Sequence, residues 1–576
     1  MQLKTAGLTP TPSGAQWSPE SVAVGAFPHA AAVHGWSTGY GFDAFSDPEW
    51  RDSSLSPTPP QPAFFDTPFL HPEDEVWNAF TNLGSPDSSA SDMSSPGVLL
   101  PGFIQPLPMM MNPTTIEYLY VNGVFSLPTT QLQNALLQVF VDCVLPSMPI
   151  IDWPAFINAV CNRDSDHGSM SLFLFYAIMV SASTFVDLGQ LQEAGYSTRQ
   201  EAQEAFYTKA KLLYQAEYEP NTITVVQALL FMTYRLETAD GDDSRYWCSI
   251  ATSTAQSIGL FRDVAGVKNV RLNPKFWKRL AWTCYTTDCQ IALRLRCRPI
   301  IHSSTFCHQM LTEDDFELYN LSPEALVQSL GYPLSHSINV QQDLALMCIA
   351  NATLCVSISE VLDLQGKSRT HQGSFTSASS PTNSETTDHN ARISAVELKL
   401  AEWASTFPSS IQTYTFETNN INDENTLSLQ RNLLHMQFYT TIAVFYQSQP
   451  LPSSTFCVQY AARQITQIAS DLYQKKLHRR VPIVGVTAIL VALIIHIPGT
   501  KKADPQERAQ AFQNFQLGLE VMADLQDVYQ EANQVMTWAY KILENVVEVP
   551  FSQTVQGVHS PPQVASCLSM SVPQVM

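Results

Sequence analysis

A run of thiol and imidazole side chains in the middle of the chain is the first feature that could do chemistry. Thiolates and imidazoles are the ligands that Zn²⁺ prefers, and the paired ligands of a structural zinc site usually stand two to four residues apart. The spacings in this run do not fit that rule, and its first three cysteines point to different sides of a predicted helix. We therefore expect core thiols and no zinc site. The members of the run are Cys284, Cys289, Cys297, His302, Cys307 and His308.

A carboxylate, Asp288, stands within the apolar face of that same helix, among neighbours such as Tyr285 and Ile291. An ionised carboxylate on a buried face is costly unless a cation or hydrogen-bond donors pair with it. We expect a structural ion pair here and not a catalytic acid. The candidate partners are Arg245, Arg262, Arg294 and Arg298.

The signatures of the common enzyme classes are missing from the sequence. It has no GxSxG, no Walker loop, no HExxH and no kinase set. His302 and His308 have no nucleophile with an orienting acid beside them in the sequence. The sequence thus predicts no catalytic residue and no enzyme. A helical domain of this size can hold a pocket between helices, so a small-molecule effector stays an open hypothesis without assigned residues.

Two helices must position these side chains. The first runs from Asp242 to Ile258, and Gly259 can end it in the left-handed conformation. The second runs from Pro274 to Arg298, with Asn273 as N-cap, Pro274 at the first helical position and Pro299 as the stop. Both carry wide apolar stripes at three- and four-residue spacing. The pair is expected to form a buried helical hairpin.

The residues of this hairpin resemble the fungal-specific transcription factor domain, the middle homology region of zinc-cluster regulators, and in particular cutinase-transcription-factor-like proteins. The resemblance extends over residues 115–500, with Phe261 where the family usually has His and Cys289 where it usually has Arg. It lies in the order and spacing of 145–152, 227–232, 245–247, 257–263, 278–293, 298–301 and 400–408. The structural family motif that it assigns is Arg245, Tyr246, Trp247, Gly259, Leu260, Arg262, Asp263, Trp282, Asp288, Arg298 and Pro299.

The resemblance implies a nuclear transcription regulator that controls a pathway-specific gene set, such as a secondary-metabolite cluster or carbon-source genes. Family members bind zinc through two C-x2-C-x6-C halves upstream of the helical region, but this sequence has no such module, and residues 1–112 hold no cysteine. No cofactor and no DNA-binding residue are therefore assigned, and DNA contact requires a missing module or a partner. The alternative is a DNA-binding-deficient co-regulator or scaffold that pairs with a complete zinc-cluster factor, as a homo- or heterodimer.

The pattern along the chain predicts an all-α multi-helix bundle over residues 113–546, flanked by a disordered arm and tail. A stretch of serine, threonine and asparagine at 366–390 reads as a disordered insertion, and 547–576 as a disordered tail. Sustained strand-like alternation is not found. Apart from the hairpin, the predicted helices are 128–143, 153–160, 169–186, 198–216, 222–237, 338–364, 391–406, 426–449, 453–477, 484–497 and 504–546.

Residues 1–112 are rich in proline and serine, and their acids outnumber the two bases, Lys4 and Arg51. Such a composition cannot bury enough surface to offset the entropy lost on ordering. Aromatic residues are interleaved with the acids, most densely at 42–50 and 73–80. This alternation is typical of activation segments that bind a coactivator. A coactivator or the transcription machinery is thus the expected partner, with a plain solubilising tail as the alternative.

The formal net charge of −21 argues against non-specific binding to nucleic acid or an anionic membrane. Eleven scattered cysteines without a CxxC indicate a reducing compartment. The apolar segment 483–497 is shorter than the roughly 20 residues that span a bilayer, so we expect a core helix and no membrane association. The basic cluster is either a nuclear import signal or a solvated helix end. Its residues are Lys475, Lys476, Arg479 and Arg480.

Overall fold

A computed structural model gives the fold of most of the chain beyond residue 99. All described residues belong to one compact unit, Val98–Met576. The predicted arm up to residue 99 and the predicted tail from 548 lie outside them. The structure describes residues 100–161, 170–236, 243–262, 273–319, 336–373, 383–406, 421–449 and 453–547.

The secondary structure of the described residues is helical, and the only β-type pairing among them is an isolated bridge between Ile104 and Met170. The predicted all-α multi-helix fold is confirmed. The helices are α2 (Pro113–Val121), α3 (Thr130–Val139), the π-helical turn η2 (Phe140–Val144), α4 (Trp153–Cys161), α5 (Leu172–Ser183), α6 (Leu188–Glu193), α7 (Arg199–Gln215), α8 (Thr222–Met232), α9 (Asp243–Ser257), α10 (Pro274–Leu295), η3 (Glu313–Asp315), α12 (Ile338–Gly373), α13 (Asn383–Thr406), α15 (Ile421–Gln447), α16 (Ser454–Gln474), η4 (His478–Arg480), α17 (Ile483–Thr500), α18 (Pro505–Asp524) and α19 (Gln530–Val547).

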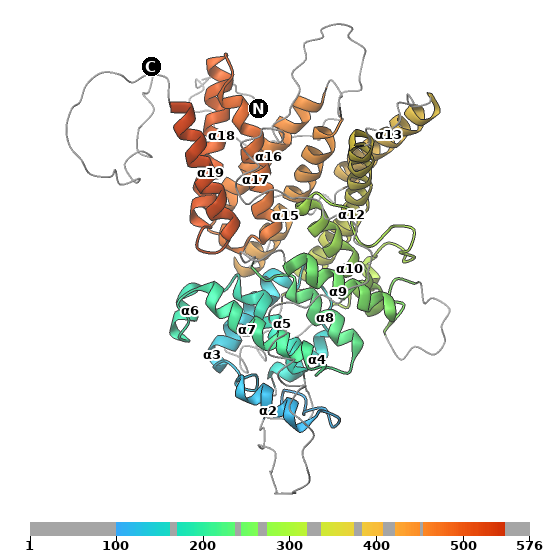
Figure 1. Ribbon diagram of the computed structural model, residues 1–576, viewed down its shortest axis with the longest axis vertical. Helices are drawn as coiled ribbons and strands as arrows, with labels where there is room; N and C mark the ends of the chain where they lie inside the picture. Colours follow the sequence, from blue (N-terminus) through green and yellow to red (C-terminus); the bar gives the residue numbers. More distant parts are fainter. Residues whose placement is uncertain are drawn as a thin grey trace, which may run out of the picture. The chain divides into compact units, whose positions relative to one another are not determined.

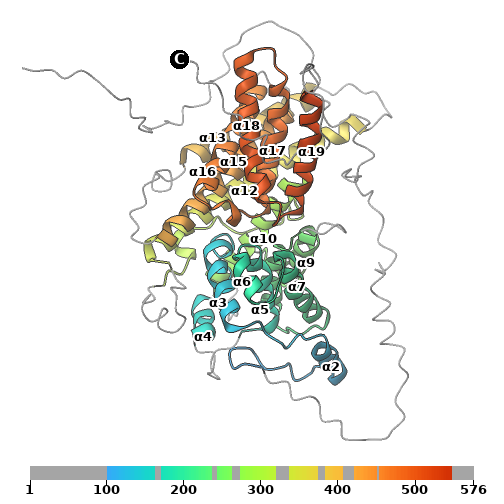
Figure 2. The same cartoon turned by 90° about the vertical axis from the view of Figure 1, so that its left-hand side faces the viewer.

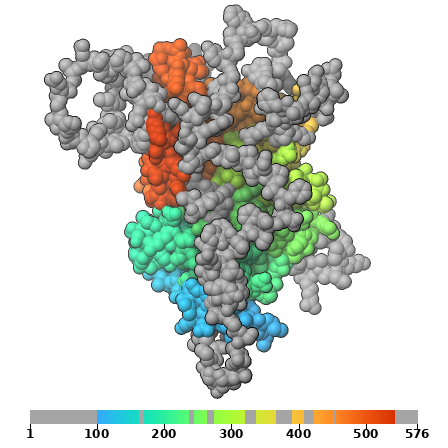
Figure 3. All heavy atoms as spheres, viewed as in Figure 1, coloured from blue at the N-terminus to red at the C-terminus, as the bar shows by residue number. Residues whose placement is uncertain are grey.

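The helices form two groups, with α10 between them (Figures 1 and 2). In the N-terminal group, α5 packs against α7 and α8, and α8 packs against α9. In the C-terminal group, the main pairs are α15 with α16 and α17 with α18. Helix α10 contacts α8 and α9 on one side and α12 and α17 on the other. In the space-filling view, the teal surface of α6 and α7 meets the red surface of the C-terminal helices (Figure 3).

Helix α5 is the centre of the N-terminal group because it is apolar nearly all round. Such a helix has no face to give to water and must be covered on every side. Its only described residue that is not buried is Leu174. Tyr176 fits this environment because its hydroxyl donates hydrogen bonds to the carbonyl oxygens of Val124 and Ser126, at 2.7 and 3.0 Å. Helix α5 is therefore buried on every side by the rest of the N-terminal group.

Two described helices, Ile338–Gln365 within α12 and Ile483–Thr500, are long and apolar enough to cross a membrane. More than half of the apolar window of each is buried inside the fold, as in the core helices of soluble proteins. For α17 the covering elements are α16 and α18. The apolar segment 483–497, within α17, is therefore part of the packed core.

Three predicted boundaries are wrong. The fold begins upstream of residue 113, since Phe103 and Ile104 are buried in the core. The predicted insertion at 366–390 is helical at both ends, since α12 continues to Gly373 and α13 begins at Asn383. Once packing has nucleated a helix, each residue added to its end gains a hydrogen bond at little cost in free energy. The predicted helix 504–546 is two helices, and the turn between them has no Gly or Pro to mark it.

The two helices α18 and α19 are held together by a tertiary contact. Tyr529, at the end of the turn after α18, donates its hydroxyl to the carbonyl oxygen of Val481 at 2.8 Å, and α19 packs back on α18.

The short helices α2 and α6 were also missing from the predicted set. Both are short and mostly solvent-exposed, with a single buried residue each, Leu119 and Leu191, so they carry almost no periodic signal.

We predict that Gly499→Ala destabilises the protein by about 1–3 kcal/mol, although alanine is the better helix former. An alanine Cβ at residue 499 of α17 would lie 2.6 Å from the Cβ of Ala511 on α18, so the helices would have to move apart. Gly499→Ala combined with Ala511→Gly should recover most of the loss. Urea unfolding of the single and double variants measures both effects, with Gly189→Ala, where an added Cβ would make only ordinary van der Waals contacts, as the control. Equal stability of Gly499→Ala and wild type would contradict the close contact.

Candidate functional site

The helical hairpin α9–α10 forms as the sequence predicts at two of its four ends. Gly259 has φ +73°, and Leu260 donates its N–H to the carbonyl oxygen of Ala255 at 2.9 Å, which is the closing bond of a Schellman motif. Asn273 caps α10 by accepting from the N–H of Lys275 at 3.0 Å. Asp242, the predicted first residue of α9, lies outside the described residues.

The end of α10 was predicted wrongly. The helix stops at Leu295, and not at the residue before Pro299. Arg296 takes the left-handed conformation with φ 53°, and Cys297 donates its N–H to the carbonyl oxygen of Ala292 at 3.1 Å. The chain therefore turns through a Schellman-type cap before the proline is reached. This early turn brings Ile301 back against the side of α10.

Asp288, in the middle of α10, has a side chain that is 0% exposed. Its Oδ1 lies 3.5 Å from Arg245 Nη1, and its Oδ2 accepts from the N–H of Ile301 at 2.7 Å. Burial raises the pKa of Asp288, and the Ile301 hydrogen bond and the Arg245 charge act in the opposite direction. The predicted structural ion pair is confirmed, and Arg245 is its partner among the four candidates.

Arg245 also joins two parts of the chain. Its side chain is 28% exposed, and Nη2 donates to the carbonyl oxygen of Arg298 at 3.1 Å. Arg294, one of the other candidates, donates to the Ser244 hydroxyl and so links α10 to the start of α9. Arg262 and Arg298 are exposed. The Asp288 carboxylate and Arg245 thus join α9, α10 and the segment that follows α10 at one point.

Two aromatic members of the family motif, one on each helix of the hairpin, are buried. Trp247 is buried and meets the rings of Tyr207 and Tyr214 edge to face, with centroids 6.0 and 5.6 Å apart. Trp282 is buried and donates its Nε1–H to the carbonyl oxygen of Gln309 at 2.9 Å. Leu260 and Pro299 are also buried, Tyr246 is exposed, and Asp263 lies outside the described residues.

The thiols and imidazoles of the run 284–308 are not brought to one place. Cys284 and Cys289 are fully buried, and burial raises the pKa of each thiol. Cys307 is exposed, and the Nε2 atom of His308 is 2.7 Å from the carbonyl oxygen of Leu260. Across the described residues, no group of three or more His, Cys, Asp or Glu side chains could hold a metal ion.

The basic cluster at 475–480 pins η4 to neighbouring helices. Arg479 pairs with Asp524 at 3.0 Å and with Asp527 at 3.1 Å, and Lys475 Nζ donates to the Ser428 hydroxyl at 3.3 Å. Arg480 lies 3.9 Å from a carboxylate oxygen of Asp142. Both arginines and Lys475 thus have structural partners, and the nuclear import signal stays a prediction.

A buried charged cluster joins the two groups of helices, and sequence reasoning missed it. His336 Nδ1, just before α12, lies 2.7 Å from Asp423 of α15, and His336 Nε2 lies 3.7 Å from Asp142 of η2. Burial would lower the pKa of His336, but the hydrogen bond to Asp423 and the charges of both carboxylates outweigh it, so the pKa is raised. Burial raises the pKa of Asp142. No local pattern could connect residues so far apart in sequence.

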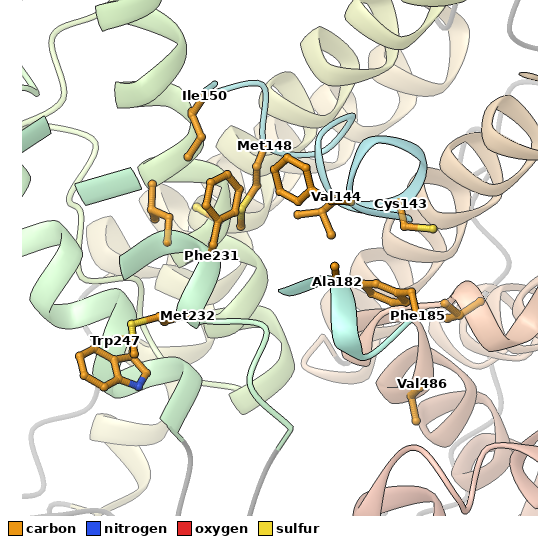
Figure 4. Close-up of a cluster of buried hydrophobic side chains, with 14 of the residues drawn as sticks. Cys143, Val144, Met148, Ile150, Ala182, Phe185, Phe231, Met232, Trp247 and Val486 are labelled. Atoms are coloured by element: carbon orange, nitrogen blue, oxygen red, sulfur yellow. The ribbon is translucent and has the colours of Figure 1, made fainter. Parts of the chain in front are cut away.

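A cavity opens beside this junction, where the N-terminal group meets the C-terminal group. Phe185 closes the end of α5 and lies between Cys143 of η2 and Val486 of α17 in the close-up (Figure 4). The cavity walls come from both groups and include Phe185, Leu236, Ile291, Leu344, Leu434 and Ile483. Its atom-free space is about 1150 Å³, which includes space open to solvent.

The fold and its junction thus define an all-helical bundle with an internal cavity. The fungal specific transcription factor domain family matches residues 137–431, which is just over half of the chain. The chain therefore belongs to the fungal-specific transcription factor domain family. The matched region contains α4 to α10, α12, α13 and the first part of α15, so it includes the whole hairpin and part of the cavity wall.

Curated relatives agree with this family. The chain is 36% identical to the cutinase transcription factor 1 beta of Fusarium vanettenii over 81% of this chain and 54% of that protein. It is 28% identical to the transcription factor cpaR of Aspergillus oryzae, over 72% of this chain and 71% of that protein. It is 26% identical to the fusaric acid cluster transcription factor FUB12 of Gibberella moniliformis, over 31% of this chain and 26% of that protein.

The chain spans about half the length of the cutinase transcription factors that it matches. All of these names describe transcription factors, in agreement with the prediction of a regulator rather than an enzyme. The predicted resemblance of the hairpin residues to the fungal-specific transcription factor domain is confirmed.

We predict that Asp288→Ala lowers the free energy of unfolding by about 3–5 kcal/mol, because it leaves the Ile301 N–H and the Arg245 charge without their shared partner. Asp288→Asn should cost less, since an amide oxygen can still accept from Ile301. Urea unfolding gives both values, and Asp314→Ala at an exposed position is the control. A loss of less than about 1 kcal/mol in Asp288→Ala would show that the carboxylate does not organise the hairpin.

A second prediction concerns pH. Because the pKa of His336 is raised in the fold, its contribution to stability is fully present below the ordinary histidine pKa of about 6.5 and is lost as pH rises through the raised value. Asp423→Asn removes the closest anionic partner of His336, so it should lower the melting temperature more at about pH 6 than at about pH 8.5. Thermal unfolding at both pH values checks this, with Asp314→Asn as control. An equal loss at both values would rule out the charged pair.

Proposed function

We propose that this protein is a nuclear transcription regulator of a pathway-specific gene set, such as a secondary-metabolite cluster. The observation that carries the proposal is the family match over the hairpin and its surroundings. The printed name of one relative, a fusaric acid cluster transcription factor, supports the kind of gene set. Nuclear localisation is supported by the same relatives, all of them named as transcription factors.

In this proposal the helical unit and the N-terminal residues 1–99 have different tasks. The helical unit is the regulatory part, since its two groups meet at a junction with buried charges and a cavity, where a change in one group can reach the other. Residues 1–99, with aromatic side chains such as Phe42, Phe45 and Trp77 among acids, recruit a coactivator. No residue of the 576 is assigned to DNA contact.

The test tethers the full chain to a reporter promoter through a heterologous DNA-binding domain, which supplies the DNA contact from outside. We expect activation of the reporter and a nuclear fluorescent signal from the tagged chain. Changing Phe42, Phe45, Trp50, Trp77 and Phe80 to alanine should remove most of the activation, because a coactivator groove binds the aromatic groups.

The matched control changes Ser53, Ser54, Ser56, Ser88 and Ser89 to alanine, which alters residues close to the same segments and keeps the aromatics. Western blots establish that all chains reach the same level. A tethered chain that leaves the reporter unchanged, neither activated nor repressed, would overturn the proposal of a transcription regulator. Repression would keep the regulator and reject the activation segment, and activation that survives the aromatic changes would also reject the segment.

A further inference from the structure

Four charged side chains, here called the junction cluster, lie where the two groups of helices meet. They are Asp142 of η2, His336 just before α12, Asp423 of α15 and Arg480 of η4. The side chains of Asp142, His336 and Asp423 are at most 11% exposed, whereas that of Arg480 is 32% exposed. Charges removed from water are costly unless they are paired with one another. The two carboxylates therefore depend on His336 as their most deeply buried cation.

The protonated form of His336 balances the cluster when both carboxylates are ionised, because two cations then face two anions. His336 Nδ1 lies 2.7 Å from Asp423, and His336 Nε2 lies 3.7 Å from Asp142. Arg480 approaches Asp142 at 3.9 Å from the opposite element, η4. Cys143, the neighbour of Asp142, adds no charge, because burial raises the pKa of its thiol to about 12. Loss of the imidazole proton would leave two carboxylates with the partly exposed Arg480.

Rising pH acts against this arrangement. Burial lowers the pKa of His336, but the hydrogen bond to Asp423 and the charges of both carboxylates outweigh it, so this pKa lies above the ordinary histidine value of about 6.5. Burial raises the pKa of Asp142. Both shifts mean that the closed cluster binds protons more tightly than an open and solvated one. Because the two groups are coupled, the proton that is lost as pH rises belongs to the pair.

Asp142 lies in a turn that differs from an ordinary α-helical turn. The element η2 continues α3 as a π-helix, in which Leu145 donates its N–H to the carbonyl oxygen of Phe140, five residues back, at 2.9 Å. Turns of this kind are rare and occur frequently at functional sites. The turn has no Gly or Pro, and all five of its residues are buried. Tertiary contacts therefore hold it in this form.

The same turn meets α15 at a second polar point. Gln430 donates its Nε2–H to the carbonyl oxygen of Cys143 at 3.3 Å, and its Oε1 accepts from the Ser147 hydroxyl at 3.0 Å. Asp423 and Gln430 are seven residues apart, so they stand on one face of α15, two turns from each other. That face thus holds η2 through the charged cluster at one point and through an amide at the other. Hydrogen bonds in such a network support one another, so the loss of one point weakens the second.

We propose that η2 and the junction cluster form a proton-operated latch between the two groups of helices. With His336 protonated, Asp142 is held beside Asp423 and the latch is closed. When the imidazolium gives its proton to solvent, it no longer attracts Asp142, and η2 separates from α15. The latch belongs to the helical unit alone, whereas its effect on gene expression rests on the proposed function.

The thiol of Cys143 reports on the latch because it is buried within η2. The full-length protein is treated with N-ethylmaleimide between about pH 6 and about pH 9, a range that brackets the titration of a histidine with a raised pKa. Mass spectrometry follows the alkylation rate of each cysteine. The rate at Cys143 is divided by that at Cys284, a buried thiol of α10, so that global unfolding and the general rise of thiolate with pH cancel.

We expect this ratio to rise with pH by up to about tenfold per pH unit, which is the dependence of an opening coupled to the loss of one proton. A ratio that does not change with pH in the wild-type protein would overturn the latch. This result needs no variant, so it holds even if a substitution in the cluster prevents folding.

Two variants with opposite expected results identify the groups. His336→Gln cannot be protonated, so its ratio should be high already at about pH 6. Asp142→Asn has no charge to bury, so its ratio should stay low at about pH 9. General destabilisation would move both variants in the same direction, and that result would overturn the latch. His302→Gln and Asp314→Asn make the same changes at exposed positions and should behave as wild type.

The tethered reporter separates this inference from the proposed function. If alkylation follows the expected pattern but His336→Gln and Asp142→Asn activate the reporter equally, the latch stands and its role in regulation is refuted. If the reporter responds to the tethered chain but the alkylation ratio does not depend on pH, the latch is refuted and the transcription regulator stands.

Discussion

The buried carboxylate of Asp288 is the interaction on which the centre of this structure depends. Removing an ionised group from water is costly, and here the cost is offset by the N–H of Ile301 and the guanidinium of Arg245. Those two partners come from opposite ends of the hairpin segment, one at the start of α9 and one after α10. A single charge thus sets the packing of α9 on α10 and the path of the chain beyond them. Burial of Trp247 on α9 and of Trp282 on α10 supplies the apolar stabilisation that the ion pair lacks.

Helix α10 transmits this constraint to the rest of the molecule. It contacts α8 and α9 in the N-terminal group and α12 and α17 in the C-terminal group, so its rotation decides which side chains face the junction. The polar groups at that junction are unusual in an interior: the amides around Gln290, and the His336 cluster with Asp142 and Asp423. Buried polar networks of this kind specify one arrangement of the helices more than they stabilise it.

Much of the local structure could be predicted because its causes are local. Asn273 caps α10, Gly259 ends α9 in the left-handed region, and α5 is central because it has no polar face. The errors have a common origin in contacts between distant residues. The turn between α18 and α19 depends on Tyr529 reaching Val481, and no residue of the turn itself signals it. The helical ends of the predicted insertion likewise continue helices whose packed residues lie on either side of it.

The sequence by itself determined the helical class, the hairpin, the need of Asp288 for a cation and the resemblance to the regulator family. Each of these follows from residue types at short spacing, where side-chain chemistry and helix periodicity act within a few turns. Only the tertiary structure decided that Arg245 is the partner, that the basic residue Arg479 is bound by Asp524, and that amides from three helices meet in one cavity. These depend on which helix faces meet across the fold, and helix–helix pairing at long range leaves no mark in the local pattern.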